Sequence, residues 1–263
     1  MSAHVGDLLT AALAREIAES GISVYAVTSP ASAAAALAAR ELGASELAIA
    51  TGFTSLDAEP VPNVTLGEAG LFTTGAVLVD DPFDTFSLLA RGRVGVAVAP
   101  AQLDAAGRTN LSGVGPPGRP KVALPGARGL PDNNASPSRV WYVLPAHSPR
   151  QLVERVGVVC GAVPPAGAIR RLLTPAGCFE LRPGGWQALW LTPDGAELVA
   201  GAPGIGISVT GTEPVVTEPD TDALAAVRRA DPHDVRLIEF SAGADAAARF
   251  QEAAAREGVS PRA

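Results

Sequence analysis

The sequence predicts the α/β class, with an open, mainly parallel sheet flanked by helices. Short aliphatic or β-branched runs alternate with helical stretches, and helix start and stop signals separate them. A long segment rich in glycine and proline follows the most strand-like run, residues 94–98. With 263 residues and 47% hydrophobic content, the chain can bury a substantial core. We expect one domain over residues 1–240 and a helical extension or tail over 241–263.

The first two elements are indicated by local patterns. Apolar residues recur at helical spacing between Val5 and Ile17, with charged residues between them. Gly21 is a helix stop signal, so we expect this helix to end at about Ser20. The β-branched run at residues 22–27 then predicts a strand.

A second helix is expected to begin directly after that strand. Ser29 is a favourable N-cap, and Pro30 suits the first helical position because its missing N–H has no partner to lose there. The helix is expected to run to about Leu42. A strand that feeds directly into a helix N-terminus also forms an anion site. An ordinary capped helix is the alternative interpretation.

The remaining elements follow from similar runs. Strands are expected at residues 47–50, 93–98, 140–144, 152–159, 177–181, 188–191, 196–200 and 207–209, and helices at 82–90, 220–230 and 244–256. Residues 235–240 (VRLIEF) fit either a strand or part of a tail. We find no internal repeat.

Residues 101–138 are expected to form a long loop. Glycine and proline punctuate this segment throughout, and aliphatic residues are sparse. A loop of this length in a compact domain is usually functional or disordered. Short apolar pieces and polar residues between the glycines favour an ordered binding loop, because glycine lets the backbone approach a ligand closely. A plain surface loop is the alternative.

Composition excludes several classes of function. The net charge of −7 gives no electrostatic basis for binding nucleic acid. The two cysteines, Cys160 and Cys178, form no CxxC pair, which argues against a metal–thiolate site and a disulfide scaffold, so we expect no metal. Charged residues interrupt the first apolar run, so we expect no membrane span and a cytoplasmic protein.

The long segment carries a recognisable motif. It matches AQxDxxGxxNxSxxG, whose fixed positions are Ala101, Gln102, Asp104, Gly107, Asn110, Ser112 and Gly115. This motif resembles the signature of class I CoA-transferase β subunits, as in the glutaconate CoA-transferase group. GARGLPDN at residues 126–133 and the run at 147–161 are most similar to β subunits of actinobacterial steroid-ring hydrolases. Asp132, in place of a glycine, and residues 203–217 depart from that subfamily.

The resemblance implies a fold, a partner and a substrate. It implies an open CoA-transferase-like α/β fold and a separately encoded α-like subunit, usually assembled with the β subunit as an α2β2 heterotetramer. The substrate would be an acyl-CoA bound where the subunits meet, with no further cofactor. In the steroid-ring hydrolases the catalytic glutamate lies in the α subunit.

One position departs from the transferase pattern. Transferases of this family carry a glutamate in a turn after the second strand, and that carboxylate attacks the thioester. The matching turn here reads Ala50-Thr51-Gly52. Alanine offers no nucleophile, so the resemblance implies that this subunit does not perform ordinary glutamyl-CoA transfer.

Three residues are candidates for catalysis: Arg128, Asn133 and Glu68. A guanidinium between glycines can pair with a carboxylate or phosphate through two hydrogen bonds, or it can brace a surface loop. Asn133 can donate a hydrogen bond to an enolate or carbonyl oxygen. Glu68 is the carboxylate nearest to the altered turn, and a structural role is its alternative. His147 can act as a general base or as a hydrogen-bonded structural residue.

A second group is expected to line the substrate: Gln102, Asn110, Ser112, Gly126 and Gly129. The side-chain amides of the loop can stabilise a substrate oxygen, and they are equally suited to tying the loop to itself.

We therefore expect the β-like subunit of a heteromeric enzyme that acts on an acyl-CoA or related carbonyl substrate. The expected reaction is hydrolytic C–C cleavage or another enolate reaction, with the base on the partner subunit. A CoA-transferase with a different nucleophile, and a non-catalytic scaffold that supports an active α-like partner, are the alternatives.

Overall fold

The structure divides into two compact units. It is a computed structural model that describes residues 4–26, 29–51, 55–56, 78–79, 82–116, 118–209, 215–216 and 220–256. The first unit combines the two ends of the chain, Met1–Leu88 and Pro219–Ala263, and the second is the continuous segment Leu89–Glu218. Helix α3 (Pro82–Ala90) lies at the boundary in sequence.

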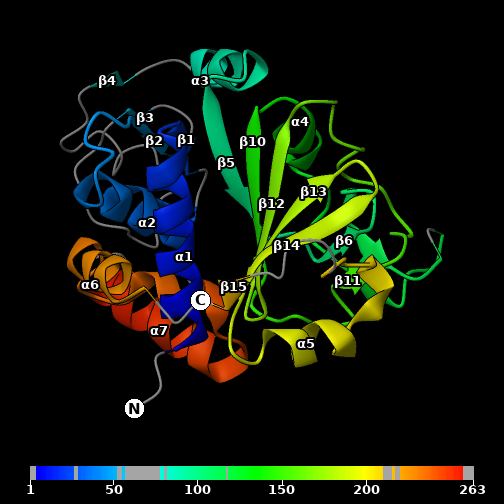
Figure 1. Ribbon diagram of the computed structural model, residues 1–263. Coiled ribbons are helices and arrows are strands. Elements are labelled where there is room, and N and C mark those ends of the chain that lie inside the picture. Colours follow the sequence, from blue (N-terminus) through cyan, green and yellow to red (C-terminus); the bar gives the residue numbers. More distant parts are fainter. Residues whose placement is uncertain are drawn as a thin grey trace. The chain divides into compact units, whose positions relative to one another are not determined.

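Helices from both ends of the chain build the first unit (Figure 1). They are α1 (Val5–Ser20), α2 (Pro30–Glu41), α6 (Thr221–Ala230), the 3-10 helix η2 (Val235–Phe240) and α7 (Gly243–Arg256). The expected caps are confirmed. Gly21 ends α1 in the left-handed conformation, and Ser29 caps α2 by accepting a hydrogen bond from the Ser32 N–H. Such local signals fix these helix ends.

Alanine has a packing role in α2. Seven of its alanines are buried, and they lie at positions 31, 33, 34, 35, 36, 38 and 39. Their small side chains allow α1, α6 and η2 to approach this helix on several sides. The alanine content therefore suits a central helix that is covered almost all round.

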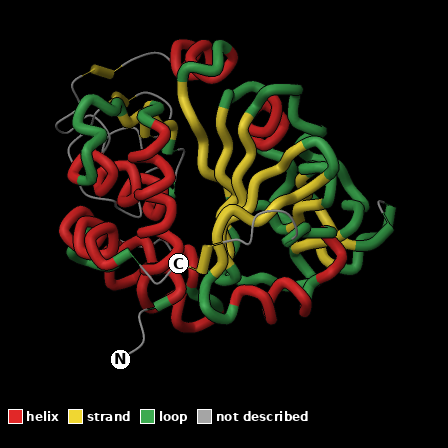
Figure 2. Tube along the Cα trace, in the orientation of Figure 1, coloured by secondary structure: helices red, strands yellow, loops and turns green. Residues whose placement is uncertain are grey.

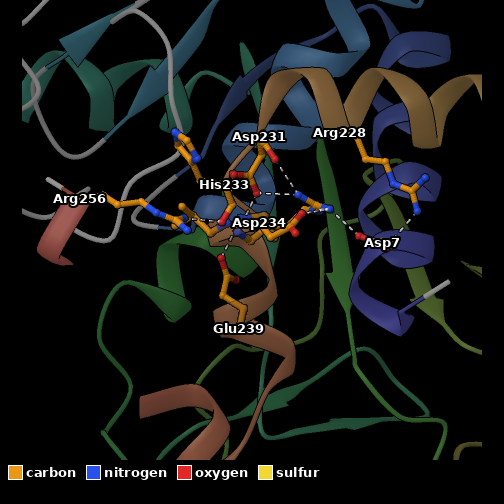
Figure 3. A network of polar contacts seen from close by, with 10 residues as sticks. Asp7, Arg228, Asp231, His233, Asp234, Glu239 and Arg256 are labelled. Carbon is orange, nitrogen blue, oxygen red and sulfur yellow. Dashed lines mark hydrogen bonds and ion pairs between the residues drawn. The ribbon is translucent and has the colours of Figure 1, made fainter. Parts of the chain in front are cut away.

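A buried ionic network joins α1 to the C-terminal segment (Figure 3). The Arg236 guanidinium pairs with Asp231 at 2.8 Å, Asp7 at 2.5 Å and Asp234 at 2.8 Å. Arg236, Asp231 and Asp7 are all at most 7% exposed. Burial alone would lower the pKa of Arg236, but its hydrogen bonds with Asp7 and Asp231 outweigh that effect and raise it. Arg236 therefore remains charged within the fold.

The strands of the first unit are short. They are β1 (Ser23–Tyr25), β2 (Ile49–Thr51), β3 (Ser55–Leu56) and β4 (Leu78–Val79). β1 and β2 are parallel, with Val24 opposite Ile49 and Tyr25 opposite Ala50. β3 pairs antiparallel with both β2 and β4.

The second unit contains the longer strands, which fan out in Figure 1. β5 (Val94–Val98), β10 (Arg139–Val143) and β12 (Ile169–Thr174) run parallel, and β13 (Gly177–Arg182) and β14 (Gly185–Leu191) continue antiparallel. β15 (Val215–Val216) pairs parallel with β14. The parallel strands and the surrounding helices confirm the expected α/β class.

Aromatic and aliphatic side chains fill the core of the second unit. Tyr142 and Trp186 meet edge to face with ring centroids 6.0 Å apart, and both are fully buried. Phe179 and Leu172, from the antiparallel pair β13 and β12, belong to the same cluster. Burial of each such side chain contributes roughly 1.5–3 kcal/mol.

The central segment is more structured than a loop (Figure 2). It contains four short strands and a helix, which are β6 (Gln102–Asp104), β7 (Thr109–Asn110), β8 (Gly113–Val114), β9 (Val122–Ala123) and α4 (Leu130–Ala135). β7 pairs with β6, and β8 with β9, in two small antiparallel ladders. These pieces are too short to show a hydrophobic period.

Several other expected elements need correction. The strand expected at residues 152–159 is only β11 (Leu152–Val153), which pairs with β6. Residues 196–200 are helical, within α5 (Gly195–Gly201), and 235–240 form η2 rather than a strand. At 207–209 only Ser208 makes a bridge, to Gln187, after the 3-10 helix η1 (Pro203–Ile205).

Helices in the part of the chain that the structure describes are all too short or too polar to cross a membrane.

Candidate functional site

Asp104 shapes the first turn of the central segment. Its carboxylate accepts hydrogen bonds from the N–H groups of Ala106 and Arg108, both at 3.0 Å, and of Val156 at 3.1 Å. The Arg108 side chain pairs with it at 2.8 Å, and Asp104 is fully buried. Gly107 completes the turn with φ at 78°. This carboxylate therefore serves the fold.

The amides of Gln102 and Asn110 bind each other and the loop. Asn110 Nδ2 donates to Gln102 Oε1 and to the Gly113 carbonyl, both at 2.8 Å, and Asn110 Oδ1 accepts from the Ser112 N–H at 3.0 Å. Gln102 Nε2 donates to the Arg150 carbonyl at 3.2 Å. Asn110 is fully buried. These contacts favour the loop-tying interpretation of both residues over substrate binding.

Ser112 faces a buried thiol. Its hydroxyl oxygen lies 3.1 Å from Cys160 Sγ, and the Leu111 N–H donates to the same sulfur at 3.2 Å. Cys160 is 8% exposed and Ser112 is half-buried. This contact fixes the chain direction between β7 and β8.

Asn134 anchors the end of α4 to the sheet. Its amide donates to the carbonyls of Gly107 and Ala162, and its oxygen accepts from the Tyr142 hydroxyl. Arg170 donates to the Asn134 carbonyl at 2.7 Å. Burial raises the pKa of Tyr142, so its hydroxyl keeps its proton for this bond. These contacts of Asn134 fix the position of the chain where residues 126–133 end.

Arg128 lies at the exposed end of that segment. Its backbone has φ at 51°, in the left-handed region that an arginine rarely adopts, and its side chain is exposed. Gly126 precedes it with φ at 99°, and its N–H donates to the Leu111 carbonyl at 3.0 Å. Such strain persists where surrounding contacts impose it, and it concentrates at functional sites.

Asn133 lies beside this exposed end. A Cβ built at Gly129 would lie 3.6 Å from Asn133 Nδ2, so the amide packs against the backbone next to Arg128. Asn133 is 9% exposed, yet its side chain makes no hydrogen bond to any residue that the structure describes. Its amide atoms are not among the buried polar atoms that lack a partner, so they reach solvent and are accessible to a ligand oxygen. Arg128, Gly126, Gly129 and Asn133 therefore lie in one short stretch of the central segment, and their roles toward a substrate stay predictions.

A carboxylate occupies the anion site expected at the start of α2. Both oxygens of Glu239, from η2, lie 2.9 Å from Ser29 Oγ, and the Ala31 N–H donates to Oε1 at 2.9 Å. The turn at Ser29 therefore caps α2 and also binds a carboxyl group, which the side chain of Glu239 supplies.

His147 is held as a neutral ring. Its Nδ1 lies 2.8 Å from Thr174 Oγ1, and the residue is 8% exposed. Burial lowers its pKa to about 4. The structural interpretation of His147 is therefore favoured over a general base.

Two other expected positions cannot be placed. Glu68 and Gly52 lie outside the described residues. Ala50, within β2, is 5% exposed.

The comparisons with known proteins cover most of the chain. No protein-family model matches it. The cholesterol ring-cleaving hydrolase IpdB subunit of Rhodococcus jostii (strain RHA1) is 29% identical over 211 residues, which is 71% of this chain and 82% of that protein. A solved structure of the decarboxylase AibA/AibB has a chain 29% identical, with a TM-score of 0.77 over 89% of this chain and 98% of that one.

More distant structures share the fold. Rhodococcus jostii RHA1 IpdAB matches with a TM-score of 0.73 at 21% identity, covering 92% of this chain and 100% of that one. Glutaconate coenzyme A-transferase from Acidaminococcus fermentans matches with a TM-score of 0.74 at 15% identity, covering 92% and 99%.

The chain has a CoA-transferase-like fold. These comparisons confirm the expected CoA-transferase-like fold in addition to the α/β class. The relatives agree with the expectation of a partner, since IpdB is a subunit and the AibA/AibB and IpdAB structures are each named for two components.

Sequence reasoning missed the contact that Glu239 makes with the start of α2. Glu239 lay in a run interpreted as a strand or a tail. The signal that could have found it is Asp231, whose side chain accepts hydrogen bonds from the N–H groups of Val235 and Arg236 and so starts a helical turn. A helical turn over 235–240 carries Glu239 back toward α2.

Proposed function

We propose that this subunit completes the substrate site of a heteromeric acyl-CoA-processing enzyme that breaks a C–C bond. Relatives with similar identity are a ring-cleaving hydrolase subunit and a decarboxylase. Both reactions leave an electron pair on carbon, and a neighbouring thioester carbonyl would hold that pair as an enolate. Ala50 offers no nucleophile for CoA transfer.

The observation that carries this proposal is the exposed end of the central segment. Arg128 presents an exposed guanidinium on a backbone held at positive φ, and the amide of Asn133, which bonds no residue that the structure describes, lies next to it. A guanidinium binds a substrate carboxylate through two hydrogen bonds, and an amide N–H stabilises a developing oxyanion. Gly126 and Gly129 let a planar thioester approach the backbone.

The partner is an α-like subunit, and the assembly is an α2β2 heterotetramer. By analogy with the steroid-ring hydrolases, the partner supplies the carboxylate that activates water. Coenzyme A enters as part of the substrate, and no other cofactor is required for hydrolysis or for an enolate reaction.

Hydrolysis of a ring diketone is the first candidate reaction, and decarboxylation is the second. The decarboxylase matches this chain at the same identity as the hydrolase subunit and over a larger share of it. The products distinguish the two. Hydrolysis adds one water and leaves the CoA thioester intact, whereas decarboxylation releases carbon dioxide.

The test is co-expression with an α-like subunit, followed by native mass and product analysis with acyl-CoA substrates that carry a β-keto group or a second carboxylate. Arg128→Ala is expected to lower kcat/KM by about 10- to 100-fold, because a charge-assisted hydrogen bond contributes roughly 1.5–3 kcal/mol. Arg128→Lys should recover part of the loss, since it keeps the charge without the bidentate geometry.

Arg119→Ala is the matched control, because Arg119 is another exposed arginine of the central segment. Its variant should keep full activity. Equal activity of the wild-type and Arg128→Ala complexes would favour the scaffold alternative. Transfer of CoA to an added carboxylate acceptor would instead restore the transferase alternative.

A further inference from the structure

Asn133 lies one position before the residue that attaches α4 to the sheet. Its N–H donates to the Gly129 carbonyl at 2.9 Å, so the backbone around it is a closed helical turn. A closed turn leaves few free dihedral angles, so the direction of a side chain on it follows from where the turn is attached. Asn134 makes that attachment and is fully buried. The direction of the Asn133 amide therefore depends on how Asn134 is held.

The Tyr142 hydroxyl supplies one of the bonds that hold Asn134. It donates to Asn134 Oδ1, whereas Asn134 Nδ2 donates to the carbonyls of Gly107 and Ala162. The Asn134 side chain thus has a partner for its oxygen and for both of its N–H groups. Among the residues that the structure describes, Tyr142 is the donor to this oxygen, so removing its hydroxyl would leave Oδ1 unpaired in the core.

The surroundings keep the proton on the Tyr142 oxygen. Burial raises the pKa of this hydroxyl by more than the neighbouring Arg170 lowers it. The Arg170 guanidinium also donates to the backbone carbonyls of Asn134 and Pro137, at 2.7 and 3.1 Å. The bond from Tyr142 to Asn134 is therefore present throughout the neutral pH range.

Packing confines Asn134 but does not require the hydroxyl. A Cβ built at Gly161 would lie 2.7 Å from Asn134 Cβ, so only a glycine leaves room for this asparagine. Tyr142 belongs to the core cluster that also contains Trp186. Phenylalanine would fill almost the same volume in that cluster. What the hydroxyl adds to the fold is its bond to Asn134.

We propose that Tyr142 is a positioning residue for the C–C bond cleavage: its hydroxyl holds Asn134 and so aims the Asn133 amide at the developing oxyanion of the substrate. This inference rests on the proposed function and assigns the alignment of its oxyanion donor to a tyrosine of β10. All three residues lie in the second unit. Groups that act on a reacting substrate must be held to within about 0.5 Å, by neighbours that are themselves locked in place.

The experiment is a double-mutant cycle in the assembled complex. Asn133→Ala removes the donor and should lower kcat by about 100-fold, as loss of an oxyanion donor does. Tyr142→Phe should lower kcat by about 10-fold with KM unchanged, because a slightly displaced donor keeps part of its effect on the transition state. In the Asn133→Ala background the same substitution should change kcat by less than about 2-fold, because the group that it aligns is absent.

A conservative variant and a matched control accompany the cycle. With 4-aminophenylalanine in place of Tyr142, an N–H donor remains at this point, so we expect most of the lost kcat to return. Thr174→Val is the control, because it also removes a buried hydroxyl of the second unit, one that contacts the His147 ring and accepts from the Ala176 N–H. It should lower the denaturation midpoint and leave kcat unchanged.

Equal effects of Tyr142→Phe with and without the Asn133 amide would overturn the inference, because they would indicate a general loosening of the core. So would a Tyr142→Phe complex with wild-type kcat, a loss of kcat that matches its unfolded fraction, no recovery with 4-aminophenylalanine, or an Asn133→Ala complex with full kcat. Each of these results leaves the proposed function to its own test, Arg128→Ala and the products. A wild-type complex that turns over no acyl-CoA would overturn both.

Discussion

The buried imidazole of His147 makes the free energy of unfolding depend on pH. The ring is buried in the native protein with its pKa lowered to about 4, whereas an unfolded histidine titrates near pH 6.5. Between these values the unfolded chain binds more protons than the folded one, so the free energy of unfolding falls as the pH falls. The loss is on the order of 3 kcal/mol across the window, and this contribution is fully present above about pH 6.5.

Urea midpoints measured between about pH 4 and 7 check this prediction, with His147→Asn as the comparison. The variant cannot titrate, so its midpoint should depend less on pH within the window. An identical slope in both proteins would contradict the assignment.

Hydrogen bonding within the protein decides which side-chain amides of the central segment are available to a substrate. Asn110, Asn134 and Asn133 are the same residue type in one segment, and sequence alone treats them alike. The structure pairs every polar atom of the Asn110 and Asn134 side chains with loop or sheet partners. Asn133 is nearly as buried but has no such partner among the described residues. Partners that lie outside the segment, such as Tyr142 for Asn134, distinguish an amide that stabilises the fold from one that is available to a ligand.

At the scale of elements, the ionic network that fixes η2 against α1 is expected to dominate the stability of the first unit. Arg236→Met should destabilise the protein by about 3–5 kcal/mol, because it leaves the Asp7 and Asp231 carboxylates buried without their cation. Chemical denaturation monitored by circular dichroism measures the change.

Arg228→Met is the matched control. Arg228 also approaches Asp7, at 3.7 Å, but its side chain is 56% exposed. Surface pairs of this kind contribute about 0–1 kcal/mol. Equal effects of the two variants would show that proximity to Asp7, rather than burial, sets the contribution.

Helix ends were predictable where the signal is local. Ser29, Gly21 and Asp220 act within a few residues of the helix that they bound, so their patterns suffice. β12 escaped prediction because Arg170 lies inside it. The carbonyls of Asn134 and Pro137, 36 and 33 positions away, accept hydrogen bonds from that buried guanidinium, and no local pattern indicates them. α5 has no side-chain N-cap bond, so its short apolar run resembled a strand.

At the scale of the whole molecule, both thiols belong to the second unit. Cys160 is 8% exposed and Cys178 is fully buried, and neither forms a disulfide. We expect both to resist a thiol reagent in the native protein and to react when the second unit opens. Labelling at increasing urea, read by mass, checks this. Rapid labelling of Cys178 without denaturant would contradict the packing.

Comparing this labelling with circular dichroism in the Arg236→Met variant separates the two units. The substitution lies in the first unit, so loss of helix at lower urea than thiol labelling would mean that the units unfold independently. Coincident transitions would mean one cooperative molecule.

The overall class was predictable from sequence, because strand–helix alternation is a coarse pattern. The packing of α6 and η2 beside α1 was not predictable, because no local pattern in the sequence indicates it. Arg236 and Asp7 are separated by 229 positions. From the sequence alone, each of them is indistinguishable from an ordinary surface charge.

The discontinuous first unit sets an order of events during synthesis. A ribosome releases α1, β1 and α2 first, but their partners α6 and η2 emerge only after the entire second unit has left the exit tunnel. Until then the alanine face of α2 and the Asp7 carboxylate have no cover. The second unit can close on itself as it emerges, whereas the first must wait for α6 and η2, so its buried faces stay uncovered for longer during synthesis.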